Sequence, residues 1–242
     1  MSVRSSSPAS ASTIASEYAS RRWRGLAVSL QSTGYALGAT LGGLLAVWLI
    51  GAWGWRSVFV ILGAVSAVVL GLCSAGDHIV AQRQLYAGTQ LLLQMACPRF
   101  GIDVTFVDGT EPGAFAAAVV PGKTVLVVAE TPANPKLDLV DLDELGAIRG
   151  PMTVVDSTFA TPLGQRPLDH GVDLVLHSAT KAIAGHNDAT LGVVAGSAEL
   201  IDWLWSFAVL QGANASPSDA LNGLRGVRTL AVRLRQQTES AQ

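Results

Sequence analysis

The chain has 242 residues, of which 50% are hydrophobic and only 14% are charged, against about 25% charged residues in an ordinary soluble domain. Its net charge of -2 provides no basic surface, which excludes nucleic-acid binding as the expected function. The two cysteines, Cys73 and Cys97, lie far apart in the sequence without a CxxC spacing. They therefore indicate neither a disulfide framework nor a metal site, and no other spacing of His, Cys and carboxylate residues suggests one.

The amino-terminal third has the composition of a membrane protein. Residues 1–16 are rich in Ser and Ala and are predicted to be disordered. Residues 26–50 carry no charge and are long enough to cross a bilayer, which takes about 20 residues. A second uncharged stretch, residues 58–75, is at the short end of that length. The arginines between positions 21 and 24 place the start of the first stretch on the cytoplasmic side.

Two interpretations of these stretches remain open: a pair of membrane-spanning helices, or a pair of helices buried in a soluble core. The length of the first stretch favours the membrane. The segments Glu17–Gly25 and Gly54–Phe59 resemble the middle of a major facilitator transporter, of the aromatic acid:H+ symporter group. The resemblance covers about residues 15–72. We therefore expect residues 17–74 to be a two-helix transporter fragment, which is too short to form a translocation path.

Beyond Ser74 the pattern changes to short β-prone runs that alternate with helical stretches. The expected strands are 78–81, 104–107, 124–129, 153–156, 174–177 and 191–195, and the expected helices are 86–100, 112–119, 139–148 and 198–210. Because the strands are nearly continuous runs of apolar residues, the pattern predicts an α/β fold with a mostly parallel sheet covered by helices on both faces.

Three of these strands end in polar residues. Asn134 follows the strand at 124–129, Asp156 ends the strand at 153–156, and the run Ser178-Ala-Thr180-Lys181 follows the strand at 174–177. The carboxyl ends of parallel strands meet at one edge of the sheet, which is where open α/β sheets bind ligands. We therefore expect these side chains to share one crevice.

This set of side chains suits pyridoxal phosphate. The amine of Lys181 could bind the cofactor aldehyde covalently and move protons. The carboxylate of Asp156 could keep the ring nitrogen protonated. The hydroxyls of Ser178 and Thr180 could bind the phosphate.

Two further residues complete the predicted pocket. Asn134 could hydrogen-bond the ring hydroxyl, and Tyr86 could stack on the ring. Taken singly, a lysine, aspartate or tyrosine after a strand usually has an ordinary structural role. Their occurrence together, in order and at three strand ends, favours the cofactor pocket. His177 and His186 are interpreted as structural or supporting residues.

The motifs of this half resemble the Cys/Met-metabolism enzymes, the group of cystathionine γ-synthase, cystathionine γ-lyase, methionine γ-lyase and the O-acylhomoserine sulfhydrylases. The motifs lie at 76–78, 85–89, 130–135, 155–159, 177–181, 185–188 and 224–230, within a resemblance that covers about residues 75–233. It implies a pyridoxal phosphate enzyme of fold-type I and a homo-oligomer. It also implies that Lys181 and Tyr86 are catalytic and that Asp156, Ser178, Thr180 and Asn134 bind the cofactor.

The sequence also departs from this family. The second apolar stretch stands where the family has a Ser/Thr-Gly-Met turn that binds the phosphate at a helix N-terminus. The segments that lend Tyr and Arg to a neighbouring subunit, and the small domain that binds the substrate carboxylate, are not found. We therefore expect a truncated domain over 75–242, weak or inactive in γ- or β-elimination and replacement on cystathionine, methionine or O-acylhomoserine-like amino acids.

The expected location is cytoplasmic for the enzyme part, with a membrane tether through residues 26–75. Two alternatives remain: a major facilitator transporter fragment, and a non-catalytic, membrane-tethered partner of a full-length homologue.

Overall fold

The computed structural model describes residues 64–241, except the side chains of Ala64 and Gln211. They belong to one compact unit that runs from Phe59 to Gln242. The predicted disordered segment, residues 1–16, and the first apolar stretch, residues 26–50, lie outside the described residues.

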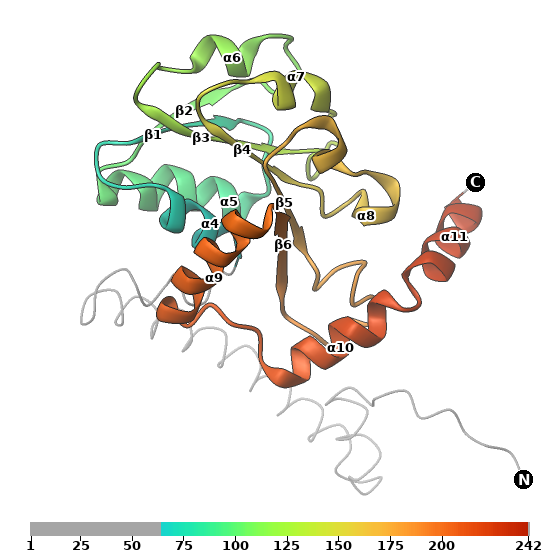
Figure 1. Cartoon of the computed structure of the whole chain (residues 1–242). Helices are drawn as coiled ribbons and strands as arrows, with labels where there is room; N and C mark the ends of the chain where they lie inside the picture. The colour runs from blue at the N-terminus through green and yellow to red at the C-terminus, as the bar shows by residue number, and fades with distance from the viewer. Residues whose placement is uncertain (1–63, 242) are drawn as a thin grey trace, which may run out of the picture. The chain divides into compact units, whose positions relative to one another are not determined.

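The centre of this unit is a six-stranded sheet with the order β2-β1-β3-β4-β5-β6 (Figure 1). Its strands are β1 (His78–Gln82), β2 (Asp103–Val107), β3 (Thr124–Glu130), β4 (Met152–Asp156), β5 (Leu174–Ser178) and β6 (Gly192–Gly196). The first five strands are parallel, and β6 runs antiparallel to β5 at the edge. The predicted mostly parallel sheet is thus confirmed, with strand ends displaced by one residue at most.

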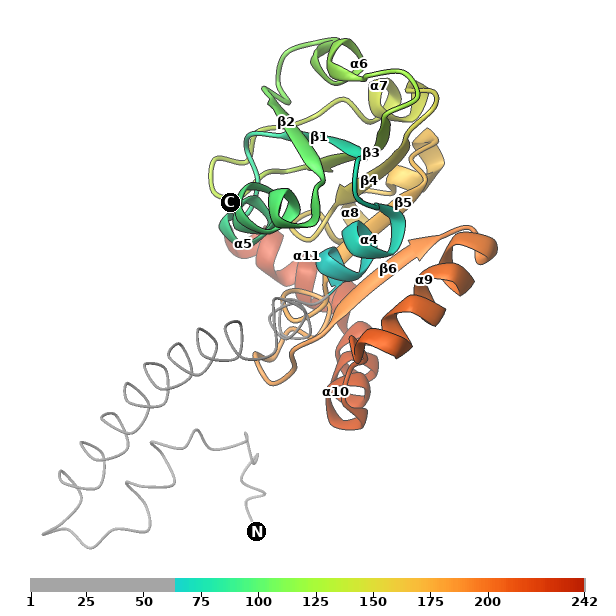
Figure 2. The same cartoon turned by 90° about the vertical axis from the view of Figure 1, so that its left-hand side faces the viewer.

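Helices cover both faces of the sheet. The helices of the described residues are α4 (Ala64–Leu72), α5 (Ala87–Leu91), α6 (Ala114–Ala118), α7 (Leu142–Ala147), α8 (Thr161–Gly164), α9 (Ala198–Gln211), α10 (Pro217–Val227) and α11 (Leu230–Ala241). A π-helical turn (Leu92–Ala96) and a 3-10 turn (Cys97–Phe100) continue α5, and another 3-10 turn spans Pro167–His170. Both views place α6 and α7 on one face of the sheet and α4 and α5 on the other (Figures 1 and 2).

The strands are buried because both faces are covered. On one face, Val80, Val127 and Val155 of neighbouring strands pack with Phe115 of α6 and Leu145 of α7. Most of the residues next to these valines in each strand are also buried, against the helices on the opposite face of the sheet. Full burial of a side chain of this size contributes about 1.5–3 kcal/mol, so these runs stabilise the sheet strongly.

The helix α4 is the described part of the second apolar stretch, residues 58–75. Val68 and Val69 are each only 1% exposed. The helix contacts β3, β5, β6 and α9, and the indole Nε1 of Trp203 donates to the carbonyl of Gly71 at 3.0 Å. Over this part the interpretation as a buried core helix applies, because packing against the sheet accounts for the apolar sequence.

The membrane prediction therefore finds no counterpart in the described residues. With nine residues, α4 is far shorter than the roughly 20 residues that a span requires. None of the helices within residues 64–241 is both long and apolar enough to cross a bilayer. The helix α4, which precedes the expected start of the enzyme domain at residue 75, is part of the same compact unit as the sheet.

Candidate functional site

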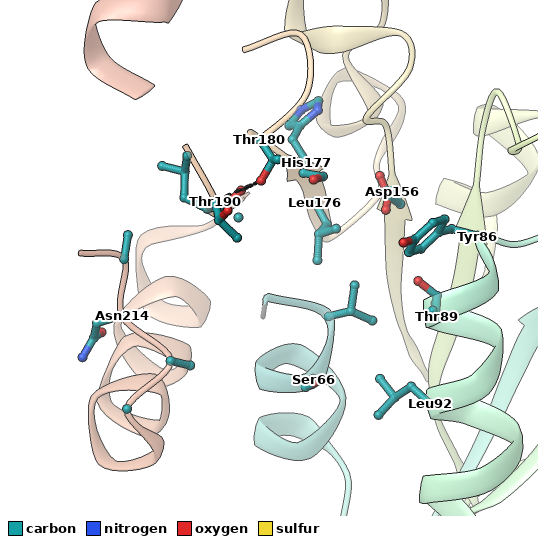
Figure 3. A pocket seen from close by; sticks show the side chains of 18 residues that line it. Ser66, Tyr86, Thr89, Leu92, Asp156, Leu176, His177, Thr180, Thr190 and Asn214 are labelled. Atoms are coloured by element: carbon teal, nitrogen blue, oxygen red, sulfur yellow. Dashed lines mark hydrogen bonds between the residues drawn. The ribbon is translucent and has the colours of Figure 1, made fainter. Parts of the chain in front are cut away.

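A cavity of about 320 Å³ lies at the carboxyl ends of β4 and β5 (Figure 3). It is lined by Val65, Ser66, Tyr86, Gly88, Thr89, Leu92, Asp156, Leu176, His177, Ser178, Thr180, Thr190, Leu191, Gly192 and the segment Gly212–Ala215. Tyr86, Thr89 and Asp156 lie on one side of it, and Thr180 and Thr190 on the other (Figure 3). Four of the six predicted site residues thus line one cavity, and three of these, Asp156, Ser178 and Thr180, belong to the five strand-end residues that we expected to share a crevice.

Tyr86 is the residue immediately before α5. Its side chain is 53% exposed and borders the cavity. A Cβ atom on Gly88 would lie only 2.7 Å from Cε1 of the Tyr86 ring. The absence of a side chain at Gly88 therefore permits the ring to lie in this position.

Asp156 is the last residue of β4. Its Oδ1 accepts two hydrogen bonds from Thr158, one from the backbone N–H at 2.9 Å and one from the hydroxyl. Its other carboxylate oxygen, Oδ2, accepts none from the described residues. Burial raises the pKa of Asp156, and the hydrogen bonds from Thr158 oppose that rise. The site therefore presents a partly buried carboxyl group with one oxygen free to bind a ligand.

Thr158 also connects this carboxylate to the next strand, because its hydroxyl oxygen accepts the backbone N–H of Ser178 at 2.7 Å. The Ser178 hydroxyl makes no hydrogen bond to a described residue, and Ser178 lines the cavity. The Thr180 hydroxyl, in contrast, accepts the N–H of Leu191 at 3.0 Å and lies 3.3 Å from the Leu191 carbonyl. Of the two predicted phosphate ligands, Ser178 is therefore the freer donor.

His177 is buried between these residues and lines the cavity. Its Nδ1 has no partner among the described residues. Burial lowers the pKa of His177, while the nearby charge of Asp156 opposes this shift. His186 lies apart from it, and its Nδ1 is 2.7 Å from the carbonyl of Ala184.

Two predicted residues do not line the cavity, Lys181 and Asn134. Lys181 lies within the turn of residues 179–184, directly after Thr180, and it is exposed. Its amine makes no hydrogen bond or ion pair with a described residue, although its main chain is fixed by two hydrogen bonds, to Ser178 and Gly185. Asn134 lies in the loop after β3, where its backbone N–H donates to Oε1 of Glu130 at 2.9 Å.

The turn after Lys181 is held by the two last helices. The guanidinium of Arg233 in α11 donates to the carbonyls of Ala182 at 2.8 Å and Ile183 at 3.0 Å, and also to that of Gly226 at 2.8 Å. In α10, Arg225 forms an ion pair of 3.0 Å with Asp188, in the same loop. The motifs at 185–188 and 224–230, about 40 residues apart in the sequence, thus lie in contact next to the turn that contains Lys181.

Sequence reasoning missed several residues of this region, namely Glu130, Ser66, Thr89, Thr190 and Asn214. Glu130 carried a recognisable signal, because it is a charged residue at the end of a buried strand, as Asp156 is. The other four carried none, since hydroxyl and amide side chains in helices and loops are common. Within residues 64–241, no cluster of three or more His, Cys, Asp or Glu residues could hold a metal ion.

The chain thus has a mostly parallel α/β sheet with a cavity at the carboxyl ends of its strands, and the cavity contains an aspartate carboxyl group and hydroxyl groups. These features are typical of α/β proteins that bind a ligand at this edge of the sheet. The model of the Cys/Met metabolism PLP-dependent enzymes matches residues 59–242. The chain belongs to this family of pyridoxal phosphate enzymes.

Similar proteins agree with this assignment. The chain is 41% identical to the L-methionine gamma-lyase of Treponema denticola over 188 residues, which are 75% of this chain and 47% of that protein. It is 38% identical to the chloroplastic cystathionine gamma-synthase 1 of Arabidopsis thaliana over 181 residues, 74% of this chain and 32% of that protein. The chain therefore spans less than half the length of these relatives.

A solved structure has the same fold. The cystathionine gamma-lyase from Lactobacillus plantarum, complexed with L-serine, superposes with a TM-score of 0.67 at 34% identity. The match covers 71% of this chain and 46% of that chain.

A second family model, that of the Major Facilitator Superfamily, matches residues 3–84. The predicted joining of two families is thus confirmed. The two matches overlap between residues 59 and 84. Within this overlap, α4 and β1 form part of the enzyme fold.

Proposed function

We propose that this domain binds pyridoxal 5'-phosphate in the cavity at the ends of β4 and β5. The observation that carries the proposal is the Asp156 carboxyl, which has one oxygen committed to Thr158 and the other free toward the same cavity as Tyr86 and Ser178. A protonated ring nitrogen is the partner that such an oxygen suits, because it would supply a charge-assisted hydrogen bond. The aromatic ring of Tyr86 offers a stacking surface.

Each residue has a role of its own in this proposal. The bound cofactor supplies an electron sink for a carbanion next to the amino group of the substrate. Asp156 holds the ring-nitrogen proton, and Tyr86 bears on the ring face. Ser178 donates a hydroxyl hydrogen bond to the phosphate. Thr180 is a second phosphate ligand, if its hydroxyl gives up its hydrogen bond to Leu191.

Lys181 and Asn134 complete the proposed site although neither lines the cavity. Lys181 follows Thr180 directly, so a rotation of its long, exposed side chain would bring the amine toward the cavity. There it would bind the cofactor aldehyde and move protons. Asn134 is the proposed partner of the ring hydroxyl.

The proposed reaction is elimination or replacement at the γ or β carbon of a sulfur-containing or O-acylated amino acid. Support comes from the similarity to methionine gamma-lyases and a cystathionine gamma-synthase. We further propose a cytoplasmic location and a homo-oligomer. Turnover assays of the full chain with cystathionine, methionine and O-acylhomoserine test the reaction, and the replacement of the phosphate-binding turn by the second apolar stretch predicts rates far below those of the relatives.

A cofactor titration tests the proposed pocket. The visible absorption of pyridoxal phosphate should shift on binding to the full chain, and Asp156→Asn should weaken binding at least about tenfold, the factor expected for one charge-assisted hydrogen bond. Asp173→Asn is the matched control. Asp173 is also a partly buried aspartate that binds a neighbouring threonine, Thr153, but it lies outside the cavity. Equal binding by wild type and Asp156→Asn would refute the proposed role.

A second candidate function is supported by the Major Facilitator match over residues 3–84. In it the first apolar stretch, residues 26–50 of the expected tether 26–75, holds the chain to a membrane, either as a transporter fragment or as a non-catalytic partner of a full-length homologue. Fractionation of cells that express the full chain, followed by an alkaline wash of the membranes, tests this candidate. Retention in the washed membranes supports a tether, and quantitative release opposes it.

A further inference from the structure

Glu130 is a buried carboxylate that the predicted cofactor contacts do not use. It is the last residue of β3, and it is only 4% exposed. Its Oε2 accepts the backbone N–H of Tyr86 at 2.5 Å, and its Oε1 accepts the backbone N–H of Asn134 at 2.9 Å. One side chain thus holds two loops, and each loop carries a residue of the proposed pocket.

The connection between β1 and β3 is reciprocal. Gln82, the last residue of β1, is fully buried, and its Oε1 accepts the backbone N–H of Glu130 at 2.9 Å. In the opposite direction, the side chain of Glu130 reaches the loop that follows β1. The two strand ends are therefore tied by two buried side chains: Gln82 accepts from the main chain of β3, and Glu130 accepts from the main chain of the loop that follows β1.

Asp156 lies beside this arrangement, because Glu130 and Asp156 are paired residues on the neighbouring strands β3 and β4. The position of Tyr86 relative to Asp156 therefore depends on the carboxylate that holds the Tyr86 backbone. Among the described residues, the Glu130 carboxylate is the acceptor of the Tyr86 backbone N–H, at the start of α5.

We propose that Glu130 is a positioning residue that sets the place of Tyr86 beside Asp156 in the cofactor pocket. This inference rests on the proposed function, which supplies the cofactor as the ligand. The position of the Tyr86 loop follows from the two hydrogen bonds of Glu130. Glu130 touches neither cofactor nor substrate in this role. It acts through the loop that carries Tyr86.

Glu130→Gln is the decisive variant. Glutamine has the same shape, but one of its two terminal groups is a donor, so one of the two backbone N–H groups loses its acceptor. Because the substitution also removes a buried charge, whose burial raises the pKa of Glu130, unfolding of the domain is not the expected result. Glu144→Gln is the matched control, because Glu144 likewise accepts a distant backbone N–H, that of Gly113 at 2.7 Å, but lies outside the cavity.

Residue-resolved amide hydrogen exchange on the full chain gives the first readout and needs no cofactor. In Glu130→Gln, the Tyr86 or Asn134 amide should exchange at least about tenfold faster, the factor expected for a lost hydrogen bond to a charged group. The amides of Val127 and Val128 should keep their wild-type rates. In Glu144→Gln, the Tyr86 and Asn134 amides should keep their wild-type rates, because glutamine retains one acceptor oxygen for the single Gly113 N–H. Wild-type exchange at both Tyr86 and Asn134 in Glu130→Gln would overturn the proposal.

The affinity for pyridoxal phosphate gives the second readout. We expect Glu130→Gln to bind the cofactor at least about tenfold more weakly, while Glu144→Gln binds as the wild type does. Faster exchange at Tyr86 with unchanged affinity would overturn the positioning role. If the wild type itself binds no cofactor, the proposed function fails, and the exchange rates still decide whether Glu130 fixes the Tyr86 loop.

Discussion

Replacement of Arg233 by alanine should loosen the turn that follows Lys181 and destabilise the domain. Arg233 donates to three main-chain carbonyls, those of Ala182, Ile183 and Gly226, at 2.8 to 3.0 Å. A hydrogen bond to a charged group contributes about 1.5–3 kcal/mol when its partner is buried. Since this region is only partly buried, water replaces some of the loss, and we expect a decrease in unfolding free energy of about 2–4 kcal/mol.

The lysine variant separates charge from geometry. Lysine keeps the positive charge but cannot reproduce the planar, forked set of donors. Arg233→Lys should therefore lose roughly half as much stability as Arg233→Ala. Arg235→Ala is the control on the same helix, because Arg235 is exposed and bonds to no described residue, and it should change stability by less than about 0.5 kcal/mol.

Urea denaturation of the full chain measures these differences, and hydrogen exchange locates them. The Gly185 amide, which donates to the Lys181 carbonyl at 2.8 Å, should exchange faster in Arg233→Ala than in wild type. A loss of stability no larger than that of Arg235→Ala, with unchanged exchange at Gly185, would refute this account of the turn.

Three further outcomes are expected. Since burial raises the pKa of Asp156, its protonated form stabilises the fold, and this contribution to the free energy of unfolding is lost as pH rises through the raised pKa. Cofactor-free Asp156→Asn should therefore unfold at a higher urea concentration than wild type at pH 7 and at the same concentration near pH 4. A stability advantage of Asp156→Asn that does not depend on pH would contradict this. Gly226→Ala should lower stability by more than about 2 kcal/mol in the same assay, because its Cβ would lie 2.2 Å from the Ala184 carbonyl oxygen; a neutral effect would show that the helix is not held so closely. Thr158→Val should cost about 1–3 kcal/mol, because it leaves the Ser178 N–H without its acceptor, and an unchanged urea midpoint would argue against this bridge.

The sheet was predictable because each strand is a short apolar run, buried on both faces, that ends in polar residues. The helices α10 and α11 were not predicted, and α10 contains two glycines, Gly223 and Gly226, which argue against a helix. Gly226 has a packing reason that the sequence does not reveal, the close approach of the Ala184 carbonyl. Glycine in a helix lowers propensity by about 1 kcal/mol, so local reasoning argues against a helix here.

The second apolar stretch shows another limit of sequence reasoning. A run of uncharged residues predicts burial, but it does not specify whether lipid or protein covers the helix. In α4 the cover is protein, with Val68 and Val69 packed inside the fold.

The candidate site was predicted at the level of the main chain and only partly at the level of side chains. The topology brings Tyr86, Asp156, Ser178 and Thr180 to one cavity, because each lies at or shortly after the carboxyl end of one of the parallel strands β1, β4 and β5. The direction of a side chain in a turn depends on local dihedral angles, which a strand pattern does not fix. Lys181 accordingly follows the cavity in sequence, yet its side chain is exposed.

Covalent capture of the cofactor tests the central claim most directly. The full chain is incubated with pyridoxal phosphate and reduced with borohydride, and the modified peptides are identified by mass spectrometry. The chain has only two other lysines, Lys123 and Lys136, and both are exposed, so they serve as internal controls. We predict that Lys181 is labelled preferentially and that Asp156→Asn reduces this labelling. Equal labelling of all three lysines, unaffected by Asp156→Asn, would contradict the claim that this domain holds the cofactor at Lys181.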